Sequence, residues 1–259
     1  MSSLTPRRAA VLAGIGLLAG FLSGLFGVGG GAVIVPLLVM LGYDIKRASA
    51  VSLGAVLISS IAGVVSYASL GQVDWLLALC LAAGSVVGAQ FGSRLLSWLP
   101  SRAVQYAFAV FLVVVAISLF LIPPSRDGVV ALTPWLAVAA ALVGLVVGAL
   151  SALLGIGGGA VIVPTLMLGF GAGDLVARGT SIAMMIPTSI SGLIAHLRAG
   201  RADFPASLVL GVGTVVTTAL GALTARALDP HLGSILFALL VLFLAGQLLW
   251  QARRMPRST

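Results

Sequence analysis

The sequence predicts an all-α polytopic membrane protein built from two inverted repeats, and three observations support this fold class. Of the 259 residues, 60% are hydrophobic and only 8% are charged, whereas a soluble domain has about 25% charged residues. Between the charged positions lie apolar stretches that reach the roughly 20 residues needed to cross a bilayer. A glycine-rich stretch at 27–36 also returns, with one conservative change, at 155–164.

The duplication defines the domain organisation. The stretch reads GVGGGAVIVP in the first half and GIGGGAVIVP in the second, and the match continues beyond it with one inserted residue. Self-similarity at a fixed offset is the signature of a chain built from structural repeats. We therefore predict a first membrane repeat at 1–122, a linker loop at 123–131 and a second membrane repeat at 132–259. The matched positions include Ser52 and Ser181, Ser60 and Ser189, Gly63 and Gly192, Gly71 and Gly200, and Asp74 and Asp203.

Each half contains five apolar segments. The first segment follows Arg7-Arg8 and has a counterpart in the second half, so it belongs to the fold rather than to a cleaved signal peptide. The second segment is short, and the third is rich in hydroxyl side chains. The fourth carries small residues at four-residue spacing, which is a packing signal in membranes, and the fifth closes the half. The predicted segments are 9–26, 31–42, 47–69, 75–97 and 103–122, then 132–154, 159–170, 176–198, 204–228 and 232–251.

The short second segments predict a hairpin in each half. Twelve helical residues span only about 18 Å, less than the roughly 30 Å of the hydrocarbon core. The first and second segments should therefore enter the membrane and return, with the glycine cluster at the tip of the hairpin. Irregular backbone at membrane depth is tolerated only where it packs against protein or lines a wet cavity.

The distribution of Lys and Arg predicts that the two halves are inverted. A hairpin followed by three full spans reverses the direction of the chain, so the second half should begin on the opposite side. With both termini in the cytoplasm, eleven basic residues fall inside and three outside, as the positive-inside rule requires. The inside set is Arg7, Arg8, Lys46, Arg47, Arg94, Arg102, Arg198, Arg201, Arg253, Arg254 and Arg257, and the outside set is Arg126, Arg178 and Arg226.

The two glycine clusters are the candidate binding site. Consecutive glycines let several N–H groups converge on one point, and the helix that follows has unpaired N–H groups and a positive dipole end, which favour an anion. Inverted hairpins would bring the tips together near the midplane, where inverted-repeat transporters keep their substrate. The alternative is that the glycines serve close helix packing. The candidates are Gly29, Gly30 and Gly31 with Gly157, Gly158 and Gly159.

Hydroxyl side chains are the other candidate ligands. Ser52, Thr180 and Ser181 lie in the third segments, and Ser23 and Ser151 precede the glycine clusters by one turn. Such groups could donate to an anion, or they could make the hydrogen bonds between helices that are common in membranes. Both interpretations remain open at this stage.

Absences narrow the function further. The chain has no Glu, and we place no Asp at mid-bilayer depth, which disfavours a cation pump or a proton relay. The net charge of +8 comes from short loops and the ends of the chain rather than from a basic stripe, so no nucleic-acid partner is expected. The single Cys80 excludes a disulfide within the chain. We expect no cofactor, no metal and no catalytic residues, because no His pair, Asp pair or Ser–Lys dyad at membrane depth suggests acid–base chemistry.

The duplicated glycine motif ending in Pro36 and Pro164, the serine-rich third segments and the chain length together resemble the TauE/SafE family of sulfite exporters. The resemblance covers essentially the whole chain. It implies a multi-pass permease of the bacterial plasma membrane for sulfur-containing anions such as sulfite and organosulfonates. A Thr-Ser pair like Thr180-Ser181 is usual in the family, whereas the first half has Val51-Ser52 there, which implies a differently shaped site in that half.

We therefore expect a permease for small anions, most plausibly sulfite or organosulfonates, that works by alternating access around the paired glycine-rich helix N-termini. The alternatives are an anion channel or a carboxylate transporter and, more remotely, an intramembrane enzyme or a membrane scaffold. The expected partners are a small anion and the lipid bilayer, and a homodimer is left open. Substrate identity, direction, coupling ion and a role for His196 in transport are not determined by these patterns.

Overall fold

The structure is a computed structural model that describes residues 6–121, 128, 130 and 133–254. Every regular element in these ranges is an α-helix, which confirms the predicted all-α class. The helices of the first half are α1 (Pro6–Phe26), α2 (Gly31–Met40), α3 (Ile45–Ser69), α4 (Trp75–Trp98) and α5 (Ser101–Leu121). Those of the second half are α6 (Pro134–Leu154), α7 (Gly159–Gly169), α8 (Asp174–Arg198), α9 (Phe204–Ala227) and α10 (Pro230–Arg254).

All ten predicted segments are helices, with boundaries shifted by a few residues. Among the described residues, eight helices are long and apolar enough to cross a membrane, as expected for a multi-pass membrane protein. The short helices are α2 and α7, with 10 and 11 residues. One boundary matters for function, because α8 begins at Asp174 rather than at residue 176 and so brings a carboxylate into the helix. The linker predicted at 123–131 lies mostly outside the described residues.

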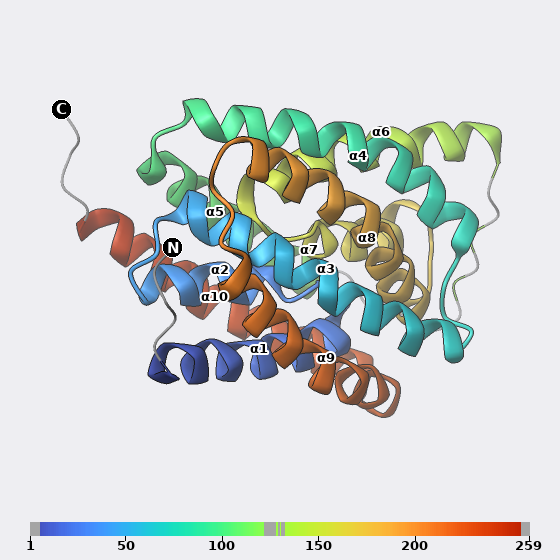
Figure 1. Ribbon diagram of the computed structural model, residues 1–259. Coiled ribbons are helices and arrows are strands. Elements are labelled where there is room, and N and C mark those ends of the chain that lie inside the picture. Colours follow the sequence, from blue (N-terminus) through green and yellow to red (C-terminus); the bar gives the residue numbers. More distant parts are fainter. Residues whose placement is uncertain (1–5, 122–127, 129, 131–132, 255–259) are drawn as a thin grey trace.

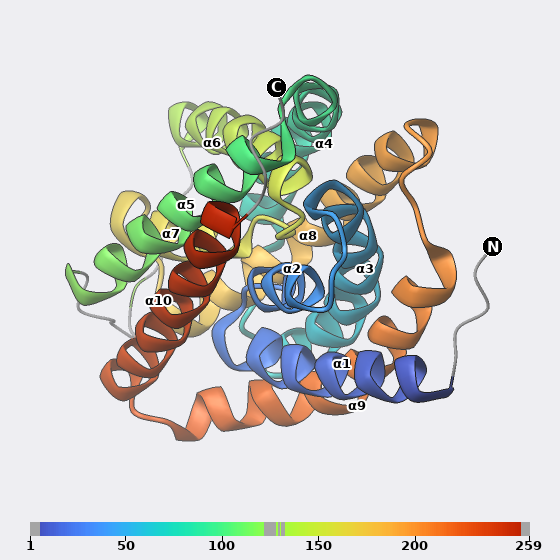
Figure 2. The same cartoon turned by 90° about the vertical axis from the view of Figure 1, so that its left-hand side faces the viewer.

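The helices of the two halves interlock. The helix α1 lies along α9 and α4 lies along α6, while α3 also packs on α9 and α4 on α8, so each of these pairs joins the halves. The matched helices α3 and α8, and α5 and α10, pack on each other. Figure 2 shows α1 with α9 on one side, α4 with α6 on the opposite side, and α5 beside α10 on a third. Exchanging the halves converts α1–α9 into α6–α4 and α3–α9 into α8–α4, so these principal pairs correspond.

Small residues allow the two outer helix pairs to approach closely. A Cβ atom on Gly84, Gly88 or Gly92 of α4 would collide with a backbone carbonyl of α6. The matched α9 does the same with α1, where Gly221 meets the backbone of Phe21. The small-residue spacing in the fourth segments is therefore a packing signal, as predicted.

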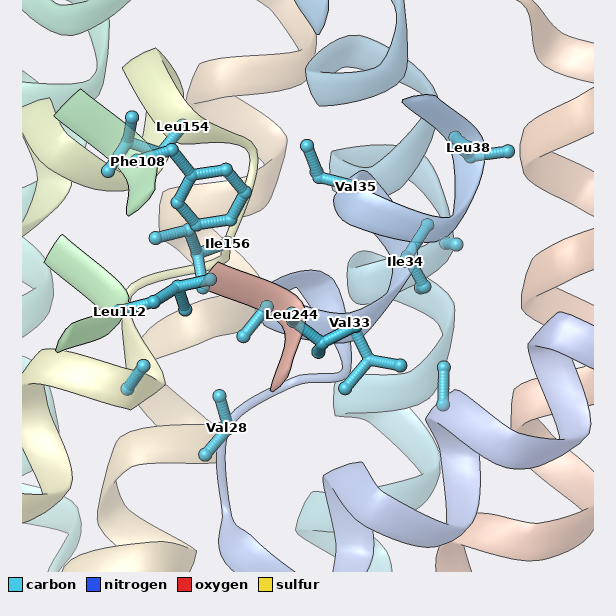
Figure 3. Packing of buried hydrophobic residues seen from close by; sticks show 14 of the residues in the cluster. Val28, Val33, Ile34, Val35, Leu38, Phe108, Leu112, Leu154, Ile156 and Leu244 are labelled. Atoms are coloured by element: carbon cyan, nitrogen blue, oxygen red, sulfur yellow. The ribbon is translucent and has the colours of Figure 1, made fainter. Parts of the chain in front are cut away.

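Each half begins with a hairpin of unequal arms, a helix of 21 residues followed by a short one. The tips of both hairpins are buried, and Val28 and Ile156 at their centres belong to the main hydrophobic cluster. Figure 3 shows these residues gathered with Phe108 and Leu112 of α5 and Leu244 of α10. One side of each tip is thus anchored on the α5–α10 pair. The start of α1 and the end of α10 both lie toward the left-hand side of Figure 1.

Candidate anion site at the two glycine tips

The backbone at each tip takes a conformation that only glycine adopts readily. Three glycines in each tip have positive φ angles, between 70° and 94°, and L side chains are strained there. This conformation ends one helix and starts the next within a few residues. The glycines concerned are Gly27, Gly29 and Gly30 in the first tip and Gly155, Gly157 and Gly158 in the second.

The start of each short helix rests directly on the tip of the other hairpin. A Cβ atom on Gly31 would lie 2.5 Å from the carbonyl oxygen of Gly155, and one on Gly159 would lie 2.5 Å from that of Gly27. Real Cβ atoms essentially never come so close, so glycine is required at both positions for packing alone. The structure therefore brings the two predicted glycine clusters together.

The first turns of α2 and α7 keep their N–H groups free of side-chain caps. Their N-cap residues are Gly30 and Gly158, and neither helix has a side-chain hydrogen bond at its cap. The first N–H groups of a helix lack partners within the helix, and the dipole makes this end positive. Two such ends meet here in buried surroundings, which is an arrangement suited to an anion.

Two apolar side chains cover the tips from the side of α3 and α8. Val56 and Met185 occupy matched positions, offset by one repeat. A Cβ atom on Gly29 would lie 2.5 Å from the Met185 sulfur and 3.1 Å from a Val56 methyl group. On Gly157 it would lie 2.5 Å from Val56 and 3.5 Å from the Met185 sulfur. The pair thus covers the tips on this side, and flexible Met is suited to rearrangement.

The hydroxyls of Ser52 and Ser181 tie the halves together. Ser52 on α3 donates to the carbonyl oxygen of Gly155 at 2.7 Å, and Ser181 on α8 donates to that of Gly27 at 3.1 Å. Each serine thus holds the tip of the opposite half. A hydroxyl carries one proton, so neither serine can also donate to an anion in this conformation.

Among the candidate serine ligands, Ser23 and Ser151 are the two whose hydroxyls remain available. Both are buried, with 1% and 0% of their surface exposed, and neither Oγ atom has a hydrogen-bond partner in the structure. They occupy matched positions on α1 and α6, one turn before the tips. Buried polar groups are rarely left without partners, so this matched pair marks a place where a polar ligand would be stabilised.

Thr180 has a different environment. Its hydroxyl accepts a hydrogen bond from the backbone N–H of Asp74 at 3.0 Å, where α4 begins. Its neighbour Ser181 is directed to the first tip instead. The assignment of Thr180 as a substrate ligand stays a prediction, and its observed contact is structural.

Sequence analysis missed a buried ion pair beside the first tip. Asp174 and Arg178 on α8 form a salt bridge of 3.2 Å, with side chains 0% and 7% exposed. Arg178 also donates to the carbonyl oxygen of Leu25 at 2.7 Å. The sequence analysis counted Arg178 among the outside basic residues, and the structure shows that its side chain is buried in the protein. The Asp–Arg spacing of four residues, which places both on one helix face, was the signal that could have revealed the pair.

A matched pair of side chains holds the end of the long arm in each hairpin. The Tyr67 hydroxyl of α3 donates to the carbonyl oxygen of Gly24 at 2.7 Å. At the matched position, His196 Nε2 lies 2.9 Å from the carbonyl oxygen of Ala152. Each clamp acts within its own half, whereas Ser52 and Ser181 act between halves. His196 is therefore buried against backbone rather than interfacial.

No group of three His, Cys, Asp or Glu side chains in the described ranges could hold a metal ion. What the tips offer instead is backbone N–H groups, two unpartnered hydroxyls and, at one side, a guanidinium. This donor set suits a small oxyanion.

Comparisons with known proteins identify the family of this chain. The family model described as "Sulfite exporter TauE/SafE" matches residues 2–119 and 140–259. The chain is 28% identical to the "Probable membrane transporter protein YunE" of Bacillus subtilis, over 93% of this chain and 97% of that protein. It is 30% identical to a "Probable membrane transporter protein" of Methanocaldococcus jannaschii, over 87% of this chain and 90% of that protein.

A "Probable membrane transporter protein" of Haemophilus influenzae is 30% identical over 72% of each chain. No solved structure matches the chain. The family model covers both halves, each with its hairpin and glycine tip, and these relatives are all described as membrane transporters. The chain therefore belongs to the TauE/SafE sulfite exporter family, a family of multi-pass membrane transporters.

Proposed function

We propose that the protein is a permease for small oxyanions, with sulfite or an organosulfonate as substrate. The observation that carries this proposal is the meeting of two uncapped helix N-termini beside two buried, unpartnered serine hydroxyls. A helix N-terminus attracts negative charge, and an anion can satisfy both N–H groups and hydroxyls. The family description supports the sulfur-oxyanion class.

Alternating access is the mechanism that the symmetry favours. Each tip is tied to the opposite half by one serine hydrogen bond, and the two ties are equivalent. Breaking one tie while keeping the other would open the tips toward one side, and the reverse exchange would open them toward the other. Hydrogen bonds between membrane helices contribute only about 0.6 kcal/mol on average, so such exchange costs little.

Membrane orientation is part of the proposal. We infer inverted halves, cytoplasmic termini and a location in the bacterial plasma membrane. The split of eleven basic residues inside against three outside supports this orientation, and leaving out the buried Arg178 does not change its direction.

Transport into proteoliposomes tests the proposal. Purified protein should catalyse saturable uptake of sulfite or methanesulfonate that is competed by related sulfonates. An anion channel predicts currents that do not saturate and no counterflow, and a carboxylate transporter predicts that acetate or lactate competes better than sulfonates. The double variant Ser23→Ala/Ser151→Ala should insert and purify normally but transport poorly. Wild-type protein that moves none of these anions would refute the proposed function.

A further inference from the structure

We propose that Arg178 is a charged ligand for the transported anion, held in reserve by Asp174, and that anion binding is coupled to uptake of one proton by Asp174. This inference rests on the proposed function as an anion permease. It concerns a charged pair beside the first tip, and the matched positions beside the second tip carry no charge.

The ion pair is not needed to build a tip. Gly27 packs on the backbone of Arg178, and Gly155 packs in the same way on the backbone of Ser49. The positions matched to Asp174 and Arg178 are Ile45 and Ser49, and the Ser49 hydroxyl bonds to the carbonyl oxygen of Ile45 in its own helix. The second tip therefore keeps the same backbone contact without any charge. The two charges on α8 need another explanation.

The pair is also a poor stabilising element. Burying two charges is costly, and the cost is recovered only when further hydrogen bonds satisfy both groups. Arg178 has such a bond, to Leu25. The Asp174 carboxylate is fully buried in the first turn of α8, where the helix dipole favours a negative charge. Neither of its oxygens accepts a hydrogen bond in the structure, and its side-chain partner is Arg178, at 3.2 Å. A carboxylate held this weakly can be replaced as the counter-ion of Arg178.

An oxyanion is a suitable replacement. A guanidinium has five N–H donors in a planar fork that matches two oxygens of an oxyanion. In Arg178, Nη1 donates to the carbonyl oxygen of Leu25 and Nη2 faces the Asp174 carboxylate. Arg178 lies one turn before Ser181, which bonds to the first tip at Gly27. The guanidinium therefore lies on α8 one turn from a residue that contacts the first tip.

Charge balance supplies the coupling. When an anion replaces Asp174 as the partner of Arg178, the buried carboxylate is left without compensation, which is strongly unfavourable. A proton taken from water neutralises it, so one anion and one proton bind together. On the described helices that pack on α8, no other buried side chain is placed to accept this proton. On α3 the Tyr67 hydroxyl lies beside Arg178, α4 places Asp74 at its first turn, and α6 and α7 carry no ionisable side chain.

The test measures binding of methanesulfonate to purified protein as a function of pH. This anion keeps the same charge across the neutral range, so any pH dependence belongs to the protein. Wild-type affinity should fall about tenfold per pH unit as pH rises, as linkage requires for one proton bound per anion. A pH-indicator dye in weakly buffered solution should report that proton directly when methanesulfonate is added.

Variants locate the proton and the charge. Asp174→Asn should bind methanesulfonate at least as tightly as wild type at acidic pH, with no pH dependence and no proton uptake. Arg178→Gln should lose the charged ligand and bind weakly at every pH, while Arg178→Lys should recover part of the affinity. Ser49→Ala, at the matched position of the other half, should behave as wild type in all respects.

Two results would overturn the inference. One is wild-type binding that is independent of pH and is accompanied by neither uptake nor release of a proton. The other is an Asp174→Asn variant whose pH dependence is as steep as that of wild type. Either result would leave the anion permease itself intact, whereas wild-type protein that binds and transports no oxyanion at any pH would refute the proposed function. The dye measurement on wild type tests for the coupled proton even if the variants fail to fold.

Discussion

At the scale of single residues, the four serines around the tips separate into two roles. Ser23 and Ser151 have buried hydroxyls without partners, and Ser52 and Ser181 use their protons to hold the opposite tip. Their sequence contexts are similar, because all four lie in apolar helices. Only the three-dimensional contacts distinguish a free donor from an occupied one.

The free donors should matter for binding. Ser23→Ala or Ser151→Ala should weaken anion affinity by about tenfold to a hundredfold, because a hydrogen bond to a charged group contributes roughly 1.5–3 kcal/mol. The melting temperature should stay the same or rise, since each change removes a buried group that lacks a partner. Titration of sulfite or methanesulfonate with melting curves on the same samples checks both expectations. Unchanged affinity in both variants would move the site away from these hydroxyls.

The occupied donors should matter for stability and for movement. Ser52→Ala or Ser181→Ala removes a hydrogen bond between the halves, which contributes about 0.6 kcal/mol on average in membrane proteins, so the melting temperature should fall slightly. Anion affinity should change less than in the Ser23 and Ser151 variants, and the rate of transport should change more. Affinity losses as large as those for Ser23→Ala would show that Ser52 and Ser181 leave the carbonyls to bind the anion.

At the scale of helices, sequence patterns were sufficient to find every helix in the described part of the chain. Hydropathy located all ten helices, and the small-residue spacing in the fourth segments correctly identified the faces on which α4 and α9 pack. The start of α8 was placed two residues late, because Asp174 looked like a loop residue. A charged side chain at the end of an apolar run gives no signal of burial, since burial depends on helices from the other half. The ion pair with Arg178 was therefore missed.

Packing of α4 on α6 predicts a clear difference between two glycines. Gly88→Ala should strongly destabilise the protein, because its Cβ would collide with the backbone carbonyl of Leu145, which cannot move away alone. Gly14→Ala on α1 meets open space and should be neutral or raise stability by up to about 1 kcal/mol through helix propensity. Melting temperatures of the two variants in detergent check this. Equal effects would contradict the close approach of α4 and α6.

At the scale of the whole molecule, the repeat predicted two equivalent halves. It did not predict which helices of one half would pack on which helices of the other. The matched sequences indicated two equivalent units. They gave no indication that α1 would lie on α9 or α4 on α6, so that each half completes the other. Partner choice depends on the fit between faces far apart in the chain, and small residues alone do not specify which face they meet.

The orientation of the halves can be measured with reporters. Fusions after Arg126 and after Thr259, both outside the described residues, should report opposite sides of the membrane, with Thr259 in the cytoplasm. The expectation follows from the split of basic residues. Paired alkaline phosphatase and fluorescent protein fusions give complementary signals for each site. Signals from the same side would be incompatible with inverted halves.

The interlocked helix pairs also have a consequence for biosynthesis. The helix α1 is made first, yet its main partner α9 begins only at Phe204, so 178 further residues (204 minus 26) must be translated before the pair can form. At the usual 5–20 residues per second this takes roughly 10–40 s. During that interval the glycine face of α1 meets lipid or an insertion factor. The first half therefore enters the membrane before its partner helices have been made, and its helix pairs are completed only after synthesis of the second half.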